Sequence, residues 1–371
     1  MTGAMSSAIA GLKAHMDKLN VIGNNVANVN TVGYKPGRVL FMDSIYTTMT
    51  TGSNGTTTVG GRNPSQIGYG SSIGSIDLDM GTGTFTATGW GLDTMISGDG
   101  FFLVGDKTTG GNIDSADPET LKVFNLSRVG NFTFGADGYL VDGQGNVVYG
   151  FMQAQDPNPD PNNPQEYISD QLVPIRYPGV DENGDLVWPS FGADGKLQDA
   201  INTNVTPNEP YPKAPIDGVS IDGKTGKITA TIKGSDQPVT IGYLAIGNVT
   251  NPAGVTHESS YYYKAEEGAG DLTITTIGNS GADVGINFVN GSLAGGNVNG
   301  ENAAADAGLP INMKVGSAGT AKLLSGGLEG SKTDLATEIS EMITTQRGYQ
   351  ANTRIITVTD TMLEELVNMK R

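Results

Sequence analysis

The chain has 371 residues, of which 54 are glycine and 16% are charged, and it contains no cysteine. Its formal net charge of -17 argues against nucleic acid or an anionic membrane surface as a partner, because both repel an acidic protein. Without cysteine, the chain forms neither a disulfide nor a thiolate metal site.

The sequence carries no signal for membrane insertion. No apolar run approaches the roughly 18 residues of a membrane span. Near the N-terminus, Lys13, His15, Asp17 and Lys18 interrupt the segment where a secretory signal would be continuously apolar. We therefore expect no membrane insertion, and either a cytosolic protein or export by a route that reads no cleavable signal.

An amphipathic helix is expected at the N-terminus. Its apolar side chains recur three, four or seven residues apart, with only Gly23 interrupting the row. This spacing is that of a and d positions and is typical of helix-to-helix packing. The row comprises Met5, Ile9, Leu12, Met16, Leu19 and Val26.

Four asparagines lie within seven positions at the end of this helix: Asn24, Asn25, Asn28 and Asn30. Amide side chains bond to nearby backbone groups, which ends helices and stabilises turns. Gly33 permits a positive φ or a close backbone approach, and Tyr34 adds a large ring with a polar tip. We interpret these six residues as an elbow between the core helix and an outer tube; a solvated loop that merely ends the helix is the alternative.

A second long helix is expected at the C-terminus, from about Asp334 to Met369, roughly 54 Å long at 1.5 Å per residue. Ser331 or Thr333 in "SKTDLATE" is the expected cap. Gln346, Thr353 and Asp360 take polar positions of the heptad frame. The apolar positions of that frame are Leu335, Ile339, Met342, Tyr349, Ile356, Leu363 and Val367.

The centre of the chain, from about residue 73 to residue 330, favours β-structure. "GTFTATGWGLDTMIS", "NFTFGADGYLVD" and "GKITATIK" alternate apolar and polar residues between Asp-Gly, Asn-Gly and Gly-Gly turn signals. Most of the chain's 17 prolines fall in 151–220, where an acidic excess and "QDPNPDPNNPQE" indicate loops or edge strands. A glycine-rich insertion is expected near 270–310.

The sequence thus predicts a mainly β protein whose β-rich central domains are flanked by long N- and C-terminal helices that pair in a helical core. The expected domains are 1–30 with 331–371 as the helical core, 31–72 as a connecting elbow or linker, 73–150 with 240–330 as an inner β-domain, and 151–239 as an inserted outer β-domain. Each helix has three possible partners for its apolar row: the other helix, the β-centre, or copies in other subunits. Packing against copies suits a filament subunit, because heterologous contacts that do not close give open helical assemblies.

Enzyme-like patterns have simpler explanations. "GVSIDGKT" (218–225) has phosphate-loop spacing, but the adjoining "GKITATIK" alternates as a strand, so we expect a hairpin rather than a strand-loop-helix site. His257, Ser259 and Ser260 have the residue types of a catalytic triad without a nucleophile elbow. "DPNPDPNNPQE" and "DENGD" offer oxygen ligands without the twelve-residue spacing of a calcium loop. We therefore expect no enzyme activity, no cofactor and no metal.

Several long stretches, in order, resemble the flagellar rod and hook proteins. "GLKAHMDKLNVIGNNVANVNTVGYK" is similar to the N-terminal signature of that family, and "GGLEGSKTDLATEISEMITTQRGYQANTRIITVTDTMLEELVNM" to its C-terminal signature. "ISGDGFFLV", "SRVGNFTFGADGYLVDGQGNVVYG" and "IGYLAIGNVTNPAG" also resemble it. The resemblance covers about the first 45 and last 45 residues, 95–150 and 240–265.

This resemblance implies an axial protein exported by the flagellar type III apparatus without a cleaved signal peptide. Such proteins polymerise into a tube with the terminal helices at its inner core, so the two apolar rows become the expected subunit interface. "VIGNN" resembles the hook form, whereas distal rod proteins more often have serine in place of Gly23. We expect an extracellular hook subunit, a universal joint that transmits motor torque to the filament; the alternative is a distal rod protein of the basal body. The implied partners are copies of itself, the distal rod protein, the hook cap, the hook-filament junction protein and the export apparatus.

Overall fold

The computed structural model of the chain describes residues 2–55, 57–107, 122–154, 167–169, 172–180, 186–188, 190–191, 197–198, 216–223, 225–233, 238–276, 287–289, 313–314 and 322–369. The chain divides into two compact units. Unit 1 comprises Met1–Asp79 and Ser331–Arg371, and unit 2 comprises Met80–Gly330. Both ends of the sequence therefore belong to unit 1, and the chain passes between the units twice.

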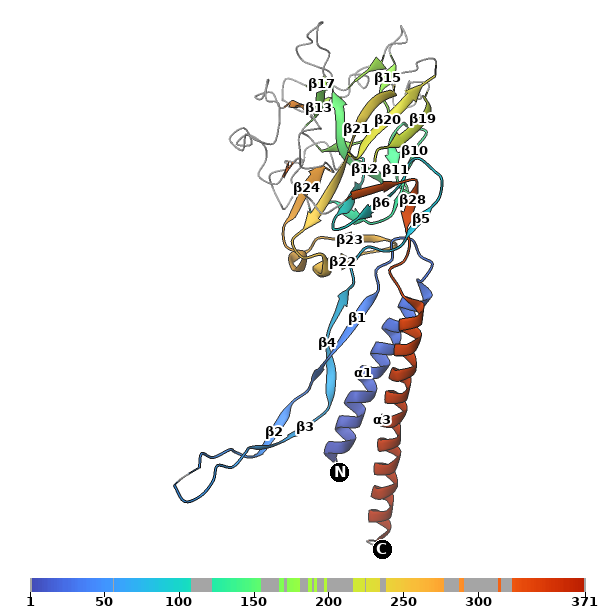
Figure 1. Cartoon of the computed structure of the whole chain (residues 1–371). Helices are drawn as coiled ribbons and strands as arrows, with labels where there is room; N and C mark the ends of the chain where they lie inside the picture. The colour runs from blue at the N-terminus through green and yellow to red at the C-terminus, as the bar shows by residue number, and fades with distance from the viewer. Residues whose placement is uncertain are drawn as a thin grey trace. The chain divides into compact units, whose positions relative to one another are not determined.

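Two antiparallel helices run side by side in unit 1 (Figure 1), α1 over Thr2–Ala27 and α3 over Leu335–Met369. The N-cap of α3 is Asp334, whose carboxylate accepts hydrogen bonds from the Ala336 amide at 3.0 Å and the Thr337 hydroxyl at 2.7 Å. The expected caps, Ser331 and Thr333, instead bond to each other just before the helix begins. The mainly β fold with a pair of terminal helices is confirmed.

A long two-stranded ribbon completes unit 1 (Figure 1). Strand β1 (Gly37–Asp43) pairs antiparallel with β4 (Ser71–Leu78), and β2 (Tyr46–Thr50) pairs antiparallel with β3 (Ser65–Gly68). The assignment of 31–72 as a connecting elbow or linker stays a prediction, but the sequence analysis did not predict that this segment contains paired strands. Both faces of β2 and β3 are exposed, so the alternation that marks a half-buried strand is absent from the sequence.

Unit 2 is built around one extended sheet, to which 15 of the described strands belong. Its main path runs in the order β10-β11-β12-β21-β7-β8-β23-β22. These strands are β7 (Phe101–Gly105), β8 (Asn125–Ser127), β10 (Thr133–Phe134), β11 (Leu140–Val141), β12 (Val147–Ala154), β21 (Pro238–Val249), β22 (Thr256–His257) and β23 (Tyr262–Lys264). Branching from them are β13 (Tyr167–Ser169), β14 (Val173–Pro174), β19 (Ile216–Ile221), β20 (Lys227–Ile232), β24 (Leu272–Thr276), β25 (Asn287–Val289) and β26 (Met313–Lys314).

Smaller strand groups accompany that sheet. Strand β6 (Asp93–Ser97) lies between β9 (Gly130–Asn131) and β27 (Lys322–Ser325), and β5 (Phe85–Ala87) pairs with β28 (Gly327–Glu329). The described residues also include two short pairs, β15–β16 and β17–β18, and two short 3-10 helices. Their bounds are Gly179–Val180, Leu186–Val187, Ser190–Phe191, Leu197–Gln198, η2 at Pro252–Gly254 and η3 at Glu267–Ala269.

The core of unit 2 forms because β7 is apolar on both faces. Phe101, Phe102, Leu103 and Val104 are all fully buried, as expected of a central strand covered on both sides. Phe102 meets Phe132 edge to face, with ring centroids 5.0 Å apart. Phe101–Val104 belong to the stretch "ISGDGFFLV", which resembles the rod and hook proteins, and they form the central strand of the β-unit.

The predicted hairpin around "GVSIDGKT" is confirmed, because β19 and β20 pair antiparallel on either side of Asp222 and Gly226. Strand β20 in turn pairs with β21, so the described strands of 216–233 extend the central sheet. The prediction that 151–239 forms an inserted outer domain stays a prediction. Most of its proline-rich part, including "DPNPDPNNPQE" and "DENGD", lies outside the described residues, as does most of 270–310. None of the helices in the described ranges is both long and apolar enough to cross a membrane.

Candidate functional site of the terminal helices and the asparagine elbow

Small and polar residues, rather than the predicted apolar rows, form the seam between α1 and α3. Asn25, His15 and Gly11 of α1 lie opposite Glu338, Gly348 and Asn352 of α3, respectively, which defines one antiparallel register. The residues of α1 buried along this line are Ala8, Gly11, Ala14, Ile22 and Asn25, and those of α3 are Thr345 and Thr359.

Glycine at two positions lets the helix axes approach closely. A Cβ atom added at Gly11 would lie 2.8 Å from the Asn352 amide nitrogen, and one added at Gly348 would lie 2.8 Å from the His15 ring. The buried threonines satisfy their hydroxyls within α3, since Thr345 donates to the Glu341 carbonyl at 2.7 Å and Thr359 to the Ile355 carbonyl at 2.8 Å. The seam is therefore tight but contributes little apolar burial.

The predicted N-terminal row lies to the side of this seam. Ile9 is 49% exposed and Met16 is 45% exposed. Met5, Leu12, Leu19 and Val26 are half-buried. The helix pair thus leaves much of this row accessible, and its assignment to subunit contacts stays a prediction.

The predicted C-terminal row divides in the same way. Met342, Tyr349 and Ile356 are half-buried beside the seam, whereas Leu335, Ile339, Leu363 and Val367 are exposed. Sequence reasoning missed further exposed apolar residues on the same helix: Ile343, Ile355, Val358, Met362, Leu366 and Met369. It also missed the seam itself, although alanine and glycine three residues apart at positions 8, 11 and 14 indicate a face for close approach.

The elbow is organised around Asn25, which is 2% exposed. Its amide nitrogen donates to the Gly37 carbonyl and to the Glu338 carboxylate, both at 3.0 Å. Its amide oxygen accepts from the Gly37 amide and the Tyr34 hydroxyl, both at 3.1 Å. One side chain therefore connects α1, the turn after it, the start of β1 and the first turn of α3.

The other elbow residues form the turn itself. Asn28 donates to the Asn24 carbonyl at 2.9 Å, and Asn24 donates to the Tyr34 hydroxyl at 3.2 Å. Gly33 has φ of 70°, which confirms the expected positive φ. Asn30 is exposed. The asparagines thus extend and close the end of α1, while the elbow's role between core helix and outer tube stays a prediction.

Charges near the elbow are only partly screened by water. Burial, together with the negative charge of Glu341, raises the pKa of Glu338, although the bond from Asn25 opposes this. Burial and the charge of Glu338 raise the pKa of Tyr34. Lys18 bridges to Glu341 at 3.0 Å, but Glu341 is half exposed, so this pair contributes little to stability.

The ribbon packs along the same helix. His15 meets Phe41 of β1 edge to face, with ring centroids 5.5 Å apart, and the Lys18 ammonium lies 5.7 Å from the centre of the Phe41 ring. Gly70, with φ of 109°, lies so close to α1 that an added Cβ would be 2.9 Å from Ala10. His15 thus lies where α1, α3 and the ribbon meet.

His257 and Ser260, two of the residues with catalytic-triad residue types, each contact a neighbouring side chain. His257 packs edge-on against Tyr263, with ring centroids 5.2 Å apart, while Ser260, which has φ of 55°, accepts a hydrogen bond from Gln144 at 3.3 Å. Within the described ranges, histidine and acidic residues form no group of three or more suited to holding a metal ion.

Two family models match the two ends of the chain. The model described as the flagella basal body rod protein matches residues 5–35, and that of the C-terminal part of flagellar basal body rod FlgEFG proteins matches residues 324–369. The flagellar basal-body rod protein FlgG of Bacillus subtilis is 32% identical over 374 residues, which cover 100% of both chains. The chain belongs to the flagellar rod and hook protein family.

Hook proteins are similar over the whole chain as well. The flagellar hook protein FlgE of Borreliella burgdorferi is 27% identical over 100% of both chains, and that of Escherichia coli is 27% identical over 99% of this chain and 100% of its own. The rod and hook family comprises structural axial components of the flagellum rather than enzymes. The matched segments contain most of α1, the elbow and α3, so the family signature coincides with the helix pair described above.

Proposed function

We propose that this chain is the subunit of the flagellar hook and that it polymerises into a tube through its terminal helices. The observation that supports this most directly is that α1 and α3 carry different residue types at their seam and at their exposed positions. Alanine, glycine, threonine and asparagine dominate the seam within the chain, while large apolar side chains recur among the exposed positions, above all on α3. A row of exposed apolar side chains marks an interaction surface.

The end of α3 adds to this argument. In the register that places Gly11 beside Asn352, the N-terminus of α1 reaches only to about residue 361 of α3, and residues 360–369 are exposed where described. Met362, Leu363, Leu366, Val367 and Met369 therefore project beyond their intrachain partner. Copies stacked along one axis would cover them, and such heterologous contacts extend without closing.

The proposed partners are those that a hook subunit requires: further copies of the chain, the distal rod protein below the hook, the hook cap, the hook-filament junction protein, and the export apparatus that secretes the subunit without a cleaved signal. The proposed location is the extracellular hook above the basal body. A joint that bends as it rotates requires strong axial contacts and weak lateral ones, and the low charge density of 16% favours lateral contacts that break and re-form.

A distal rod protein is the second candidate. It is favoured by the FlgG relative from Bacillus subtilis, whose 32% identity extends over 374 aligned residues for a chain of 371. In cells lacking the gene, a hook subunit would leave complete rods without hooks, whereas a rod subunit would leave incomplete rods. Electron microscopy of isolated basal bodies separates these two outcomes.

The assembly surface itself is tested by Ile339→Asp. A carboxylate placed among apolar contacts between subunits loses hydration without gaining a partner, at a cost of several kcal/mol. We expect no tubes from this variant and unchanged unfolding of the monomer, because Ile339 is already 45% exposed there. Ser340→Asp, at the adjacent exposed position outside the row, is the matched control and should assemble. Tubes from both variants would refute the proposed interface.

A further inference from the structure

The methionines of the chain differ between its two units. Among those whose side chains the structure describes, every methionine of unit 2 is buried, whereas five of unit 1 are between 45% and 76% exposed. The buried ones of unit 2, which we call the core methionines, are Met80, Met95 and Met152. The exposed ones of unit 1 are Met16, Met42, Met49, Met362 and Met369. A reagent that attacks methionine from solvent therefore reaches unit 1 and not the core of unit 2.

Three of the exposed methionines, which we call the helix methionines, lie on the terminal helices: Met16 on α1, and Met362 and Met369 on α3. Met16 and Ile9 are the exposed members of the predicted row on α1. Met362 and Met369 belong to one apolar face of α3, because its members follow each other at three or four residues. That face comprises Ile355, Val358, Met362, Leu366 and Met369, all of them exposed. All three sulfurs thus lie on the surface proposed for contacts between subunits.

Two exposed methionines lie outside the helices and provide a comparison. Met42 of β1 and Met49 of β2 are exposed on the ribbon, and we call them the ribbon methionines. Their side chains are exposed to a degree comparable with those of the helix methionines, but they lie outside the rows proposed for axial contacts. The two groups thus differ in place rather than in chemistry.

A hydroperoxide oxidises an exposed thioether without help from another group of the protein. The sulfur attacks the terminal peroxide oxygen, so an S–O bond forms and the O–O bond breaks. With hydrogen peroxide, the departing hydroxide takes up a proton and leaves as water, and two electrons pass from sulfur to peroxide. The product is methionine sulfoxide, a polar and chiral side chain. Because the chain has no cysteine, no thiolate of its own competes for the oxidant.

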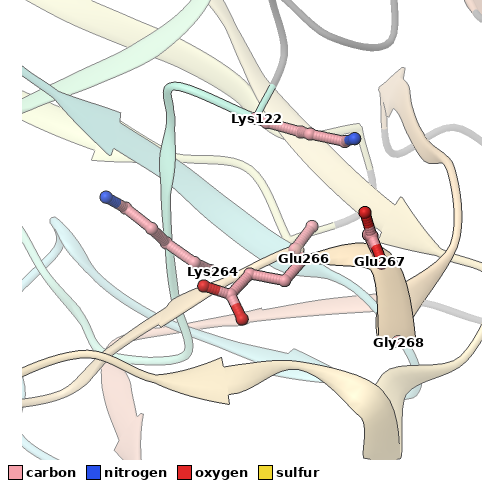
Figure 2. A pocket seen from close by; sticks show the side chains of 6 residues that line it. Lys122, Lys264, Glu266, Glu267 and Gly268 are labelled. Carbon is pink, nitrogen blue, oxygen red and sulfur yellow. The ribbon is translucent and has the colours of Figure 1, made fainter.

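An open pocket of unit 2 offers the oxidant no alternative target. This pocket of about 520 Å³ (Figure 2) is lined by Lys122, Lys264, Ala265, Glu266, Glu267 and Gly268. None of these residues contains sulfur, and Lys264 is ion-paired with Glu258 at 2.9 Å. Within the described part of the chain, oxidation at sulfur is therefore directed to unit 1.

We propose that the helix methionines are a reversible oxidation site that controls assembly: as thioethers they permit subunit contacts, and as sulfoxides they withhold the subunit from the tube. A sulfoxide oxygen is a hydrogen-bond acceptor. Placed among apolar side chains of a neighbouring copy, it loses its water without gaining a donor. Methionine sulfoxide reductases return the thioether, with a dithiol as reductant that becomes a disulfide while the oxygen leaves as water. The inference rests on the proposed function, since it requires that assembly covers the helix rows.

Peroxide treatment of the full-chain monomer tests the proposal. After the hydrogen peroxide is removed, we expect the concentration needed for assembly, measured by sedimentation of tubes, to rise about tenfold or more, because apolar burial at the oxidised positions is lost. The thermal unfolding of the monomer should stay unchanged, since these side chains are already exposed there. Treatment with both methionine sulfoxide reductases and dithiothreitol should restore assembly.

Mass spectrometry locates the oxidation. Trypsin cuts after Arg354 and Lys370, so peptide 355–370 carries both Met362 and Met369. In the monomer this peptide should gain an oxygen atom at each sulfur, while peptides with the core methionines should gain none. In assembled tubes the same peptide should oxidise severalfold more slowly, because neighbouring copies cover it.

Leucine variants show which methionines control assembly. The helix variant Met16→Leu/Met362→Leu/Met369→Leu lacks the three exposed sulfurs of the proposed contacts, and the ribbon variant Met42→Leu/Met49→Leu is the matched control. Each protein is compared with its own untreated sample, so any effect of the substitutions themselves cancels. Peroxide should raise the concentration needed for assembly of the helix variant by no more than about twofold. It should raise that of the ribbon variant as much as that of the unmodified chain.

The outcomes distinguish this inference from the proposed function. If the unmodified chain forms no tubes, the proposed function fails and this inference fails with it. If tubes form but the oxidised monomer assembles equally well, or if peroxide affects the helix variant as much as the ribbon variant, the inference alone is overturned. If the untreated helix variant forms no tubes, the rate for peptide 355–370 decides: equal oxidation in tubes and monomer overturns the inference, and protection in tubes supports it.

Discussion

Asn25 is the buried member of the asparagine cluster, and its side-chain amide makes four hydrogen bonds. It donates to Gly37 and Glu338 and accepts from Gly37 and Tyr34. Asn25 therefore joins α1 to three other segments: the turn at Tyr34, the start of β1 at Gly37 and the first turn of α3 at Glu338. Its hydrogen bonds satisfy polar groups that are partly buried. Its neighbour Asn24, by contrast, is exposed, as is Asn30.

Replacing Asn25 with alanine leaves these partners unsatisfied. We expect a loss of about 2–3 kcal/mol in the free energy of unfolding of unit 1, since buried unpaired groups cost about 1–3 kcal/mol each. Asn30→Ala is the control, with an expected change of no more than about 0.5 kcal/mol. Urea unfolding followed by helical circular dichroism measures both. Equal effects would show that Asn25 is no more structural than its exposed neighbour.

We expect the stability of the helix pair to depend on pH because of His15. Burial and then the charge of Lys18 lower its pKa from the ordinary value of 6.5. The folded chain therefore holds this proton less tightly than the unfolded chain, so the stability associated with neutral His15 is present above pH 6.5 and is lost as pH falls through the lowered pKa. Acid below pH 6.5 should accordingly weaken the pairing of α1 with α3.

Glu338 acts with the opposite sign, because its pKa is raised above 4.5 and its contribution is lost as pH rises. The comparison must therefore isolate His15. We expect His15→Gln to retain its melting temperature at pH 5.5 relative to pH 7.5 better than the unmodified chain does, as measured by helical circular dichroism of the monomer. Identical pH slopes for the two proteins would contradict the assignment.

At the scale of elements, the helices and their pairing were predictable, but the residues through which they pack were not. Apolar periodicity located both, because that pattern persists whether the partner is in the same chain or another. The same periodicity cannot tell which face the chain itself covers. Inside the chain, Gly11 against Asn352 and Gly348 against His15 give close approach without apolar bulk, and hydrophobic pattern analysis does not register such contacts.

The ribbon shows a different limit of sequence analysis. β2 and β3 are exposed on both faces, so no period of two records them. A strand that is covered on both faces, such as β7, contains a continuous apolar run instead. The elbow was partly predictable. The asparagines and Gly33 indicated a turn, but the hydrogen bond from Asn25 to Glu338, 313 positions away, depends on tertiary structure.

The glycines of α1 allow a matched test of the seam. Gly11 lies against Asn352, whereas a Cβ at Gly23 would meet nothing within 4 Å. We expect Gly11→Leu to destabilise the helix pair by about 1–3 kcal/mol through overpacking. Gly23→Leu should stabilise α1 by about 0.5–1 kcal/mol, because glycine is a poor helix former. Thermal melts of helical circular dichroism compare the two. Stabilisation by both would mean that α1 and α3 do not pack through Gly11 in solution.

Considered as a whole molecule, the chain places most of its two terminal family signatures in unit 1 and its largest buried core in unit 2. The sequence predicted this separation, because terminal heptads and central alternation are different patterns. It did not predict that the strands of 37–78 belong with the helices, nor that β19 and β20 extend the central sheet through β21. Both features depend on pairing between segments that are separate in the sequence, and the sequence of one segment does not specify which other segment it pairs with.

Unit 2 should fold without unit 1. Residues 80–330 contain a core that includes Phe102, Leu103 and Ile246, each no more than 1% exposed, together with the antiparallel pairing of β5 and β28 near its two ends. The exposed apolar rows of α1 and α3 are absent from this fragment. We therefore expect fragment 80–330 to unfold cooperatively in calorimetry and to form no tubes at concentrations at which the full chain assembles. A fragment that lacks a cooperative transition would show that the β-core depends on the helices and the ribbon. A folded fragment that still polymerises would show that the axial contacts lie in unit 2, contrary to the proposed role of the helices.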